Sequence, residues 1–323
     1  MQYRRMGNSD LEVSIIGLGG TTFGQHTTFT HYSDEAGSAN IIHHAHDLGI
    51  NLIDTADMYG DGVSESYIGK AIAGRRDHFI IASKVGVPWT DGPREGLLSR
   101  KHIMESIEGS LRRLGTDYLD LYYAHAPDPI TPIEETLRAF DDLVCQGKAR
   151  TLGCSNFSGP QIAEACTTIG RQGFSPLGVN QSPYNLLNRH VEEDVVPCCL
   201  REEMSIVAYA PLAQGVLTGK YRPGASIPEN TRAWENPSPN LAGYLAESNL
   251  EIVQRLGKWS NDAGHPVVDL AIAWLVARPF VCSVLTGVTS TTQLEANVRA
   301  IGWHLTEQQM REVEEIVDDR EQG

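Results

Sequence analysis

The sequence predicts a (β/α)8 barrel, the closed α/β (TIM barrel) fold in which parallel strands alternate with helices. Eight short apolar runs recur along the chain, and helical patterns fill the gaps between them. Most of these runs are almost continuously apolar, which is typical of strands covered on both faces. No break in composition divides the 323 residues, so we expect one domain over residues 1–323, with an open doubly wound sheet as the alternative.

The expected strands follow directly from the apolar runs. They lie at residues 13–19, 51–56, 79–85, 119–125, 149–155, 177–182, 205–211 and 281–288. Each run is short and bounded by turn residues or by a polar residue at its carboxyl end, as barrel strands should be. Because parallel strands of a barrel end at the same face, the residues that follow them should share one mouth.

Helices are expected between the strands, and several have capping signals. Three begin at capping residues: Ser99 before a stripe that ends at Gly115, Thr131 with Glu134, and Ser158 with Gln161. Five more fit near residues 35–48, 64–73, 193–203, 267–278 and 291–300.

Three segments fall outside the strand–helix repeat. Residues 1–12 predict an N-terminal hairpin that turns at "GNSD", and residues 247–263 predict an extra helix. Residues 306–319 predict a terminal helix that begins with a Thr306–Gln309 capping box.

Composition and charge exclude several kinds of partner. A net charge of −15 argues against nucleic acid or an anionic membrane as the main partner. No apolar run approaches the length of a membrane span, and the N-terminus does not read as a signal peptide. Six cysteines without a C-x-x-C pair are typical of reduced thiols in a cytoplasmic protein, and no metal site is expected. The chain is compatible with a monomer or a homo-oligomer.

The glycines of "IIGLGGTTFG" do not form a dinucleotide-binding fingerprint. Their spacing fails the pattern, and a polar loop follows them instead of a helix.

Four polar residues at or just after three neighbouring strands point to a reaction. Asp54 and Tyr59 follow the second strand, Lys84 ends the third, and His125 ends the fourth. A structural ion pair at the barrel rim is the alternative explanation, but each residue alone would be a poor choice at a buried strand end. A phenol has an ordinary pKa of about 10 and holds its proton at neutral pH unless a nearby cation stabilises the phenolate. Together the four can protonate an oxygen on which charge develops, and a hydride would have to come from a cofactor.

Seven motifs in order along nearly the whole chain resemble the aldo-keto reductase superfamily. They are "GINLIDTADMYG", "IASKV", "LDLYYAHAPDP", "GCSNFS", "VNQSPYN", "APLAQGVLTGKY" and "LTGVTSTTQLEANV". The resemblance is greatest to the bacterial branch that also resembles potassium-channel β subunits. It implies a (β/α)8 barrel that binds NADPH in an extended form and reduces aldehydes and ketones to alcohols.

The resemblance also implies residue roles. Tyr59 matches the general acid, Lys84 the group that makes the phenol a better acid, Asp54 the lysine's partner, and His125 the residue that orients the carbonyl. Ser155, Asn156 and Gln181 match the contacts to the nicotinamide carboxamide, and Tyr209 matches the aromatic ring that stacks on the nicotinamide. The remaining cofactor contacts implied are Gly20, Thr21, Thr22, Asp54, Ala210, Pro211, Leu212, Gln214, Gly215, Lys220, Arg232, Gly287, Thr289, Gln293 and Asn297.

Two positions depart from the family pattern. Gln293 stands where many members carry an arginine for the 2′-phosphate, and Ala296 where many carry a glutamate for the adenine. Lys220 and Arg232 still favour NADPH, with NADH as a weaker alternative.

The long loops 86–98 and 212–246 contain Trp89 and Trp234. These two residues either line a pocket for a small carbonyl substrate or hold the loops in place by packing. Asp57 is expected to be a solvated loop residue or a helix-start acid, with a minor role in the pocket as the alternative.

Two other functions stand as alternatives. A binding protein similar to channel β subunits would hold NADP(H) as a sensor. A barrel glycosidase could use Asp54 and Asp128 as its carboxylates, but the lysine and tyrosine have no purpose there.

Overall fold

The computed structural model describes residues 1–24, 32–88, 96–235 and 238–319, and its centre is a closed barrel of parallel strands. The strands follow one another around the barrel in chain order, and β10 pairs with β3 to close it. Their bounds are β3 Ile16–Gly19, β4 Leu52–Asp54, β5 Ile80–Val85, β6 Leu119–Ala124, β7 Ala149–Ser155, β8 Leu177–Pro183, β9 Ser205–Tyr209 and β10 Val281–Thr286. The predicted (β/α)8 barrel is confirmed.

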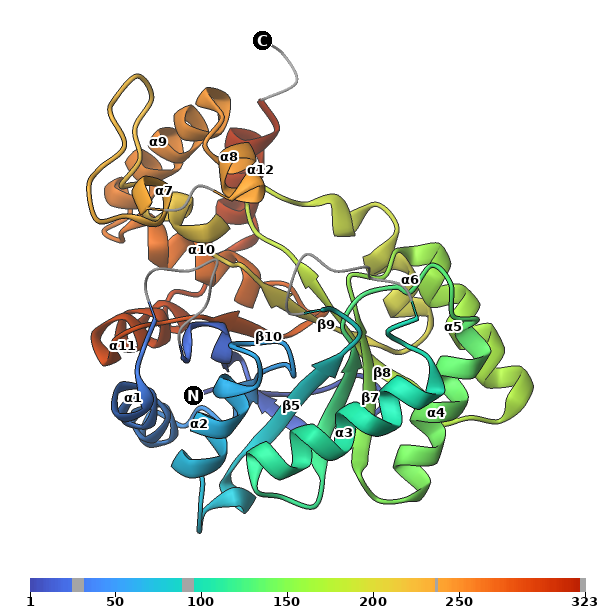
Figure 1. Cartoon of the computed structure of the whole chain (residues 1–323). Coiled ribbons are helices and arrows are strands. Elements are labelled where there is room, and N and C mark those ends of the chain that lie inside the picture. The colour runs from blue at the N-terminus through green and yellow to red at the C-terminus, as the bar shows by residue number, and fades with distance from the viewer. Residues whose placement is uncertain (25–31, 89–95, 236–237, 320–323) are drawn as a thin grey trace.

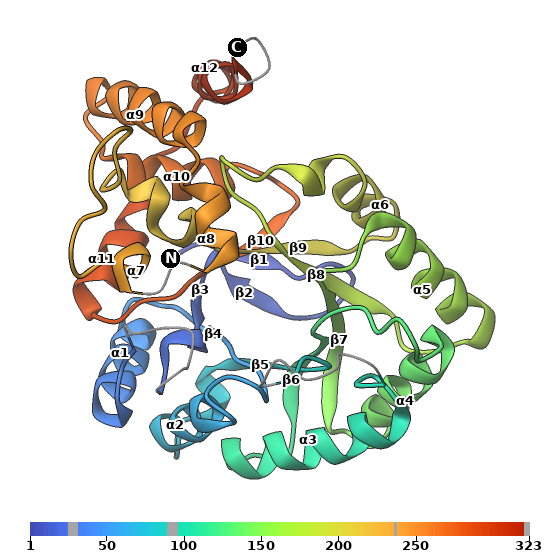
Figure 2. The ribbon, with the colours of Figure 1, turned by 45° about the horizontal axis from the view of Figure 1, so that its top comes forward.

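Helices surround the strands, as Figure 2 shows. Those that follow the barrel strands are α1 Glu35–Asp47, α2 Val63–Ala71, α3 Arg100–Leu114, α4 Ile133–Cys145, α5 Gly159–Gln172, α6 Val195–Arg201, α10 Val267–Val276 and α11 Thr291–Arg299. The additional ones are α7 Arg232–Glu235, α8 Pro239–Tyr244, α9 Glu247–Asp262 and α12 Glu307–Asp318. These four gather on one side of the barrel (Figure 1). The sequence did not predict the short helices α7 and α8, which lie within the long loop after β9.

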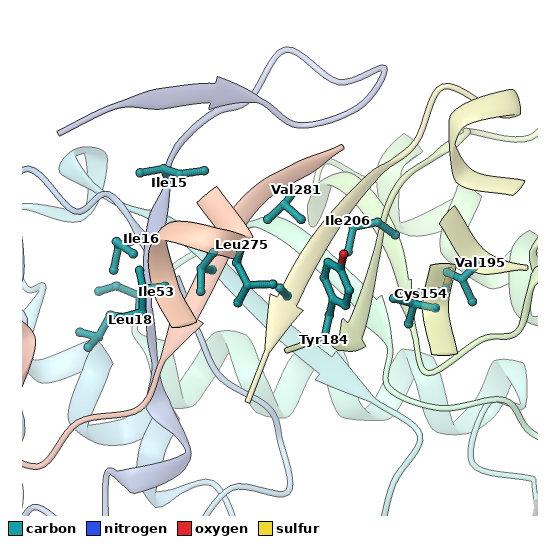
Figure 3. Packing of buried hydrophobic residues seen from close by; sticks show 14 of the residues in the cluster. Ile15, Ile16, Leu18, Ile53, Cys154, Tyr184, Val195, Ile206, Leu275 and Val281 are labelled. Carbon is teal, nitrogen blue, oxygen red and sulfur yellow. The ribbon is translucent and has the colours of Figure 1, made fainter. Parts of the chain in front are cut away.

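Two apolar layers hold the barrel together. A large cluster of buried side chains lies between strands and helices. It includes Ile16, Ile53 and Ile206 from strands and Leu275 from α10, and Figure 3 shows part of it. A smaller cluster, which includes Leu121 and Val179, lies inside the barrel. Alternation of side chains between these two layers explains the almost continuous apolar runs in the sequence.

An antiparallel hairpin of β1 (Tyr3–Arg5) and β2 (Glu12–Ser14) precedes the barrel. Met6 and Val13 are completely buried and belong to the interior cluster, so the hairpin covers one end of it. The Arg4 guanidinium donates to the carbonyl oxygens of Val276, Arg278 and Val281 at 2.6–2.8 Å. The hairpin is therefore fixed to the chain around the start of β10.

Four local expectations have clear outcomes. The capping boxes at Ser158 and Thr306 are confirmed. The box at Thr131 is wrong: α4 begins at Ile133 without a side-chain cap, because the Thr131 hydroxyl donates to Asp128 instead, at 2.7 Å. The single strand expected at 13–19 is also wrong, since the hairpin strand ends at Ser14 and the barrel strand begins at Ile16.

Candidate active site

A buried ion pair stands at the carboxyl ends of β4 and β5. Lys84 is completely buried and its ammonium donates to the Asp54 carboxylate and, at 2.7 Å, to the carbonyl oxygen of Thr55. It also lies 3.4 Å from the phenol oxygen of Tyr59. The three hydrogens of the ammonium are therefore directed at a carboxylate, a carbonyl oxygen and a phenol oxygen.

The ion pair keeps Lys84 charged. Burial alone would lower the pKa of its ammonium, but the carboxylate of Asp54 and the neighbouring Tyr59 outweigh burial and raise that pKa above its usual value. Burial raises the pKa of Asp54, against the opposing effects of Lys84 and Gln181. A cation is thus held beside a phenol inside the protein, where its field is screened less than in water.

Tyr59 and His125 lie next to each other at the mouth of the barrel. Their ring centroids are 5.8 Å apart and the rings are close to perpendicular, at 78°. Lys84 Nζ lies 4.9 Å from the centroid of the Tyr59 ring. The structure therefore brings together all four residues predicted at the strand ends.

Ser155, Asn156 and Gln181 meet at the ends of β7 and β8. The Ser155 hydroxyl donates to the Gln181 carbonyl oxygen at 3.0 Å. The Asn156 amide donates to the His125 carbonyl oxygen at 2.9 Å and accepts from the Tyr209 hydroxyl at 2.8 Å. Gln181 Nε2 donates to Asp54 Oδ2 at 2.8 Å, a contact that the sequence did not predict. This polar group is continuous with the ion pair.

The segment after β9 has an unusual backbone. Ala210, Ala213 and Gln214 have positive φ angles of 53°, 47° and 56°, and Gly215 has 98°. Left-handed conformations of residues other than glycine cost on the order of 1 kcal/mol each and persist where their surroundings fix them. A side chain at Gly215 would place its Cβ 3.3 Å from Lys220 Nζ, so glycine leaves room beside that ammonium.

This loop also contains two basic residues, Lys220 and Arg232. Lys220 Nζ lies 5.2 Å from the centroid of the Tyr221 ring. Burial lowers the pKa of the Arg232 guanidinium.

Two tryptophans were predicted to line the substrate pocket. Trp234 is 57% exposed, and Trp89 lies outside the described residues. Both assignments to a substrate pocket stay predictions.

The remaining predicted contacts lie around β3 and β10. The Thr22 hydroxyl, in the short helix η1 (Gly20–Thr22) that also contains Thr21, donates to the Val288 carbonyl oxygen at 2.8 Å. Thr289 N donates to the Gln293 side chain at 2.9 Å, just ahead of α11. Asn297 is buried on α11. A Cβ at Gly287 would lie 3.7 Å from the Thr22 side chain, an ordinary van der Waals contact, so Gly287 and Thr22 are close to each other.

Sequence reasoning misjudged Asp57. One of its carboxylate oxygens is buried and has no hydrogen-bond partner among the described residues. Burial, and then the charge of Glu65, raise the pKa of Asp57 to about 7, although Arg113 opposes them. Glu65 itself is completely buried and accepts from the Ser83 hydroxyl at 2.5 Å and from Arg113 Nε at 2.7 Å. Asp57 thus belongs to a second polar cluster beside the ion pair.

Within the described ranges, no group of three or more His, Cys, Asp or Glu side chains could hold a metal ion. The same ranges contain no helix long and apolar enough to cross a membrane.

Barrel and site together define the chain as an α/β-barrel protein with a buried lysine–aspartate pair beside a tyrosine at the strand ends. A sequence profile of the Aldo/keto reductase family matches residues 15–318, and the chain belongs to this family.

Similar proteins include some named as reductases and some named as channel subunits. A probable voltage-gated potassium channel subunit beta of Arabidopsis thaliana is 38% identical over 93% of this chain and 91% of its own length. The aldo-keto reductase YhdN of Bacillus subtilis is 35% identical over 99% and 94%. The L-glyceraldehyde 3-phosphate reductase of Escherichia coli is 35% identical over 93% and 88%.

Proposed function

We propose that the protein is an NADPH-dependent carbonyl reductase that converts small aldehydes, ketones or sugars to alcohols. The observation that carries this proposal is the Lys84 ammonium, buried against Asp54 and 3.4 Å from the Tyr59 phenol. Membership of the Aldo/keto reductase family supports an oxidoreductase. An acidic chain whose six cysteines are all free fits a cytoplasmic enzyme.

Each residue of the site has a part in this proposal. NADPH, when bound, supplies the hydride to the carbonyl carbon. Tyr59 donates its proton to the carbonyl oxygen as negative charge develops there, and Lys84 stabilises the phenolate left behind. Asp54 keeps Lys84 charged and in place, and His125 directs the carbonyl oxygen toward Tyr59. The same residues serve alcohol oxidation in reverse.

The residues present fit an extended dinucleotide. Ser155, Asn156 and Gln181 present amide and hydroxyl groups beside the ion pair, and Tyr209 offers an aromatic face next to them. Gly215 has no side chain beside the Lys220 ammonium, and Gly287 has none beside Thr22, so in this proposal the backbone at both positions can approach the cofactor. In this proposal Ala210, Pro211, Leu212 and Gln214 follow the pyrophosphate, Lys220 and Arg232 face the 2′-phosphate, and Gly20, Thr21, Thr22, Thr289, Gln293 and Asn297 complete the cofactor site.

Replacing Tyr59 with phenylalanine tests the assignment. We expect turnover of a reactive aldehyde to fall by at least about 10²-fold, because the proton donor is lost, while the Kd for NADPH stays within about threefold. Tyr118→Phe is the matched control, since Tyr118 lies just before β6, at the opposite end of that strand from His125. Unchanged turnover in Tyr59→Phe would exclude Tyr59 as the acid.

A second candidate is an NADP(H)-binding sensor subunit, and the similarity to channel β subunits favours it. A sensor should retain NADPH tightly and turn over every carbonyl compound slowly. Following NADPH absorbance against a panel of about fifty carbonyl compounds separates the two functions.

A further inference from the structure

A buried asparagine joins the loop after β8 to the loop after β9. Asn185 is completely buried, and its backbone pairs in both directions with Asn188, at 3.0 and 3.1 Å. Its side-chain oxygen accepts from Leu187 N at 2.9 Å. Its side-chain amide therefore comes from a rigid turn that the residue itself stabilises.

Both hydrogens of that amide are directed at the loop after β9. Asn185 Nδ2 donates to the Ala210 carbonyl oxygen at 3.0 Å and to the Tyr244 hydroxyl at 3.2 Å. Ala210 is the first of the residues with positive φ, and its carbonyl oxygen also accepts from Ala213 N at 2.9 Å. Tyr184, just before Asn185, donates its backbone N–H to the Tyr209 carbonyl oxygen at 3.2 Å. Two successive carbonyl groups at the exit of β9 are thus held from one turn.

The groups that Asn185 holds lie at the mouth of the barrel. Tyr209 precedes Ala210 and bonds to Asn156, while Tyr244 ends α8. Asn156 in turn donates to the His125 carbonyl oxygen at 2.9 Å, and the ring centroids of His125 and Tyr59 are 5.8 Å apart. Burial raises the pKa of Tyr209, and the phenols of Tyr59 and Tyr244 raise it further. We propose that Asn185 is a positioning residue, whose amide fixes the exit of β9 and thereby places Tyr209 against Asn156 at the mouth of the barrel. Its effect on turnover rests on the proposed function.

The first test compares Asn185→Ser with Asn188→Ser. Asn188 is the matched control, because its amide approaches the same Tyr244 hydroxyl only at 3.5 Å and is not bonded to Ala210. For Asn185→Ser we expect kcat/KM to fall at least about tenfold, since displacement of about 1 Å in a site can cost as much as 10²-fold. We also expect faster hydrogen exchange in the peptide 209–216. Asn188→Ser should remain within about twofold in both. Equal effects of the two variants, or a lowered Tm with kcat/KM and exchange unchanged, would overturn the proposal.

Relief of backbone strain gives a second readout. Glycine adopts positive φ freely, so in an Ala210→Gly background the Asn185→Ser change should cost clearly less in kcat/KM than it does in the wild-type background. Equal costs in the two backgrounds would show that Asn185 does not act through Ala210.

Asn185→Asp tests the hydrogen-bond donor itself, and it applies even if the serine variant does not fold. The introduced carboxyl group keeps the shape and the acceptor for Leu187, but when ionised it faces the Ala210 carbonyl oxygen without a hydrogen to donate. Tyr244, which accepts from Asn185, and Tyr209, which precedes Ala210, are the titratable groups on the facing elements. Comparison with wild-type protein at each pH corrects for titration of every group other than the introduced carboxyl. Relative to wild type, kcat/KM of this variant should rise several-fold between about pH 8 and pH 5.5 as the carboxyl group gains its proton. A constant ratio would overturn the proposal.

Failure of the proposed function has a separate signature. If the wild-type protein neither binds NADPH nor turns over any carbonyl compound, the reductase assignment fails. The exchange of peptide 209–216 in the Asn185 and Asn188 variants still decides whether Asn185 holds this loop.

Discussion

Replacing Lys84 with methionine should separate the charge of this residue from its packing. Methionine is similar in length and unbranched, so it fills most of the same space without the ammonium. At 3.4 Å and an effective dielectric constant of about 20, the attraction between the ammonium and a full phenolate is about 5 kcal/mol. The phenol carries only part of that charge in the transition state, so about half of the attraction, roughly 2–3 kcal/mol, is at stake. This corresponds to a decrease in kcat of about 10²-fold.

The same substitution should also destabilise the fold. It leaves Asp54 buried without its counter-charge, and removal of one partner from a buried pair typically costs about 3–5 kcal/mol. Adding Asp54→Asn removes the unpaired charge and leaves an amide that Gln181 can still contact. We therefore expect the double variant to recover most of the lost free energy of unfolding but none of the lost turnover.

Two measurements on the same samples decide between these effects. Urea denaturation gives the free energy of unfolding, and single-turnover reduction of a reactive aldehyde at saturating NADPH gives the rate. If the double variant regains turnover together with stability, the loss came from folding and the electrostatic explanation is wrong. Turnover of Lys84→Met within about fivefold of wild type would refute it directly.

Three further predictions concern pH and cofactor choice. Asp57 has a pKa raised to about 7 in the folded protein, so its ionisation opposes folding increasingly as pH rises from about 4 to 7. Asp57→Asn should therefore be more stable than wild type, by on the order of 1–3 kcal/mol at pH 8 and by much less at pH 5. Urea titrations at the two pH values measure this difference. Partial burial alone would raise the pKa of Asp128, but hydrogen bonds from the loops at 96–98 and 130–131 lower it to about 2. The stabilisation that Asp128 contributes is therefore present above about pH 4 and is lost toward pH 2. Asp128→Asn should cost about 1–2 kcal/mol at pH 7, and an unchanged urea midpoint would contradict this. NADPH should bind at least about tenfold more tightly than NADH in fluorescence titrations. The double substitution Lys220→Ala and Arg232→Ala should abolish most of that preference. If the wild-type Kd values for NADH and NADPH are nearly equal, these residues are excluded as 2′-phosphate contacts.

The barrel could be predicted because its signals are local. Each strand is a short apolar run, and the carboxyl ends of parallel strands must meet at one face, so Asp54, Lys84 and His125 could be placed together from the sequence. The boundary near Ile15 could not, because apolar residues stand on both sides of Ser14 and no turn residue marks the change from hairpin to barrel.

Contacts between distant elements explain the failures. Asp57 lies on a loop whose polar sequence suggests solvent, but in the fold it is largely removed from water and is affected by the charges of Glu65 from α2 and Arg113 from α3. Thr131 has a capping sequence, yet Asp128 competes for its hydroxyl. Asn185 carries no signal of its own, since its partners Ala210 and Tyr244 lie 25 and 59 residues further along the chain.

Closure of the barrel has a consequence for synthesis of the chain. The Ser283 hydroxyl donates to the Ser14 carbonyl oxygen at 2.8 Å, across 269 residues, and β10 is the strand that pairs with the free side of β3. At about 5–20 residues per second, a ribosome needs roughly 15–50 s between these two segments. During that time β3 presents an unpaired edge, which is the kind of surface through which nascent chains associate wrongly. The hairpin cannot protect that edge before the chain is nearly complete. The carbonyl groups that accept from Arg4 belong to residues 276–281, which are synthesised late.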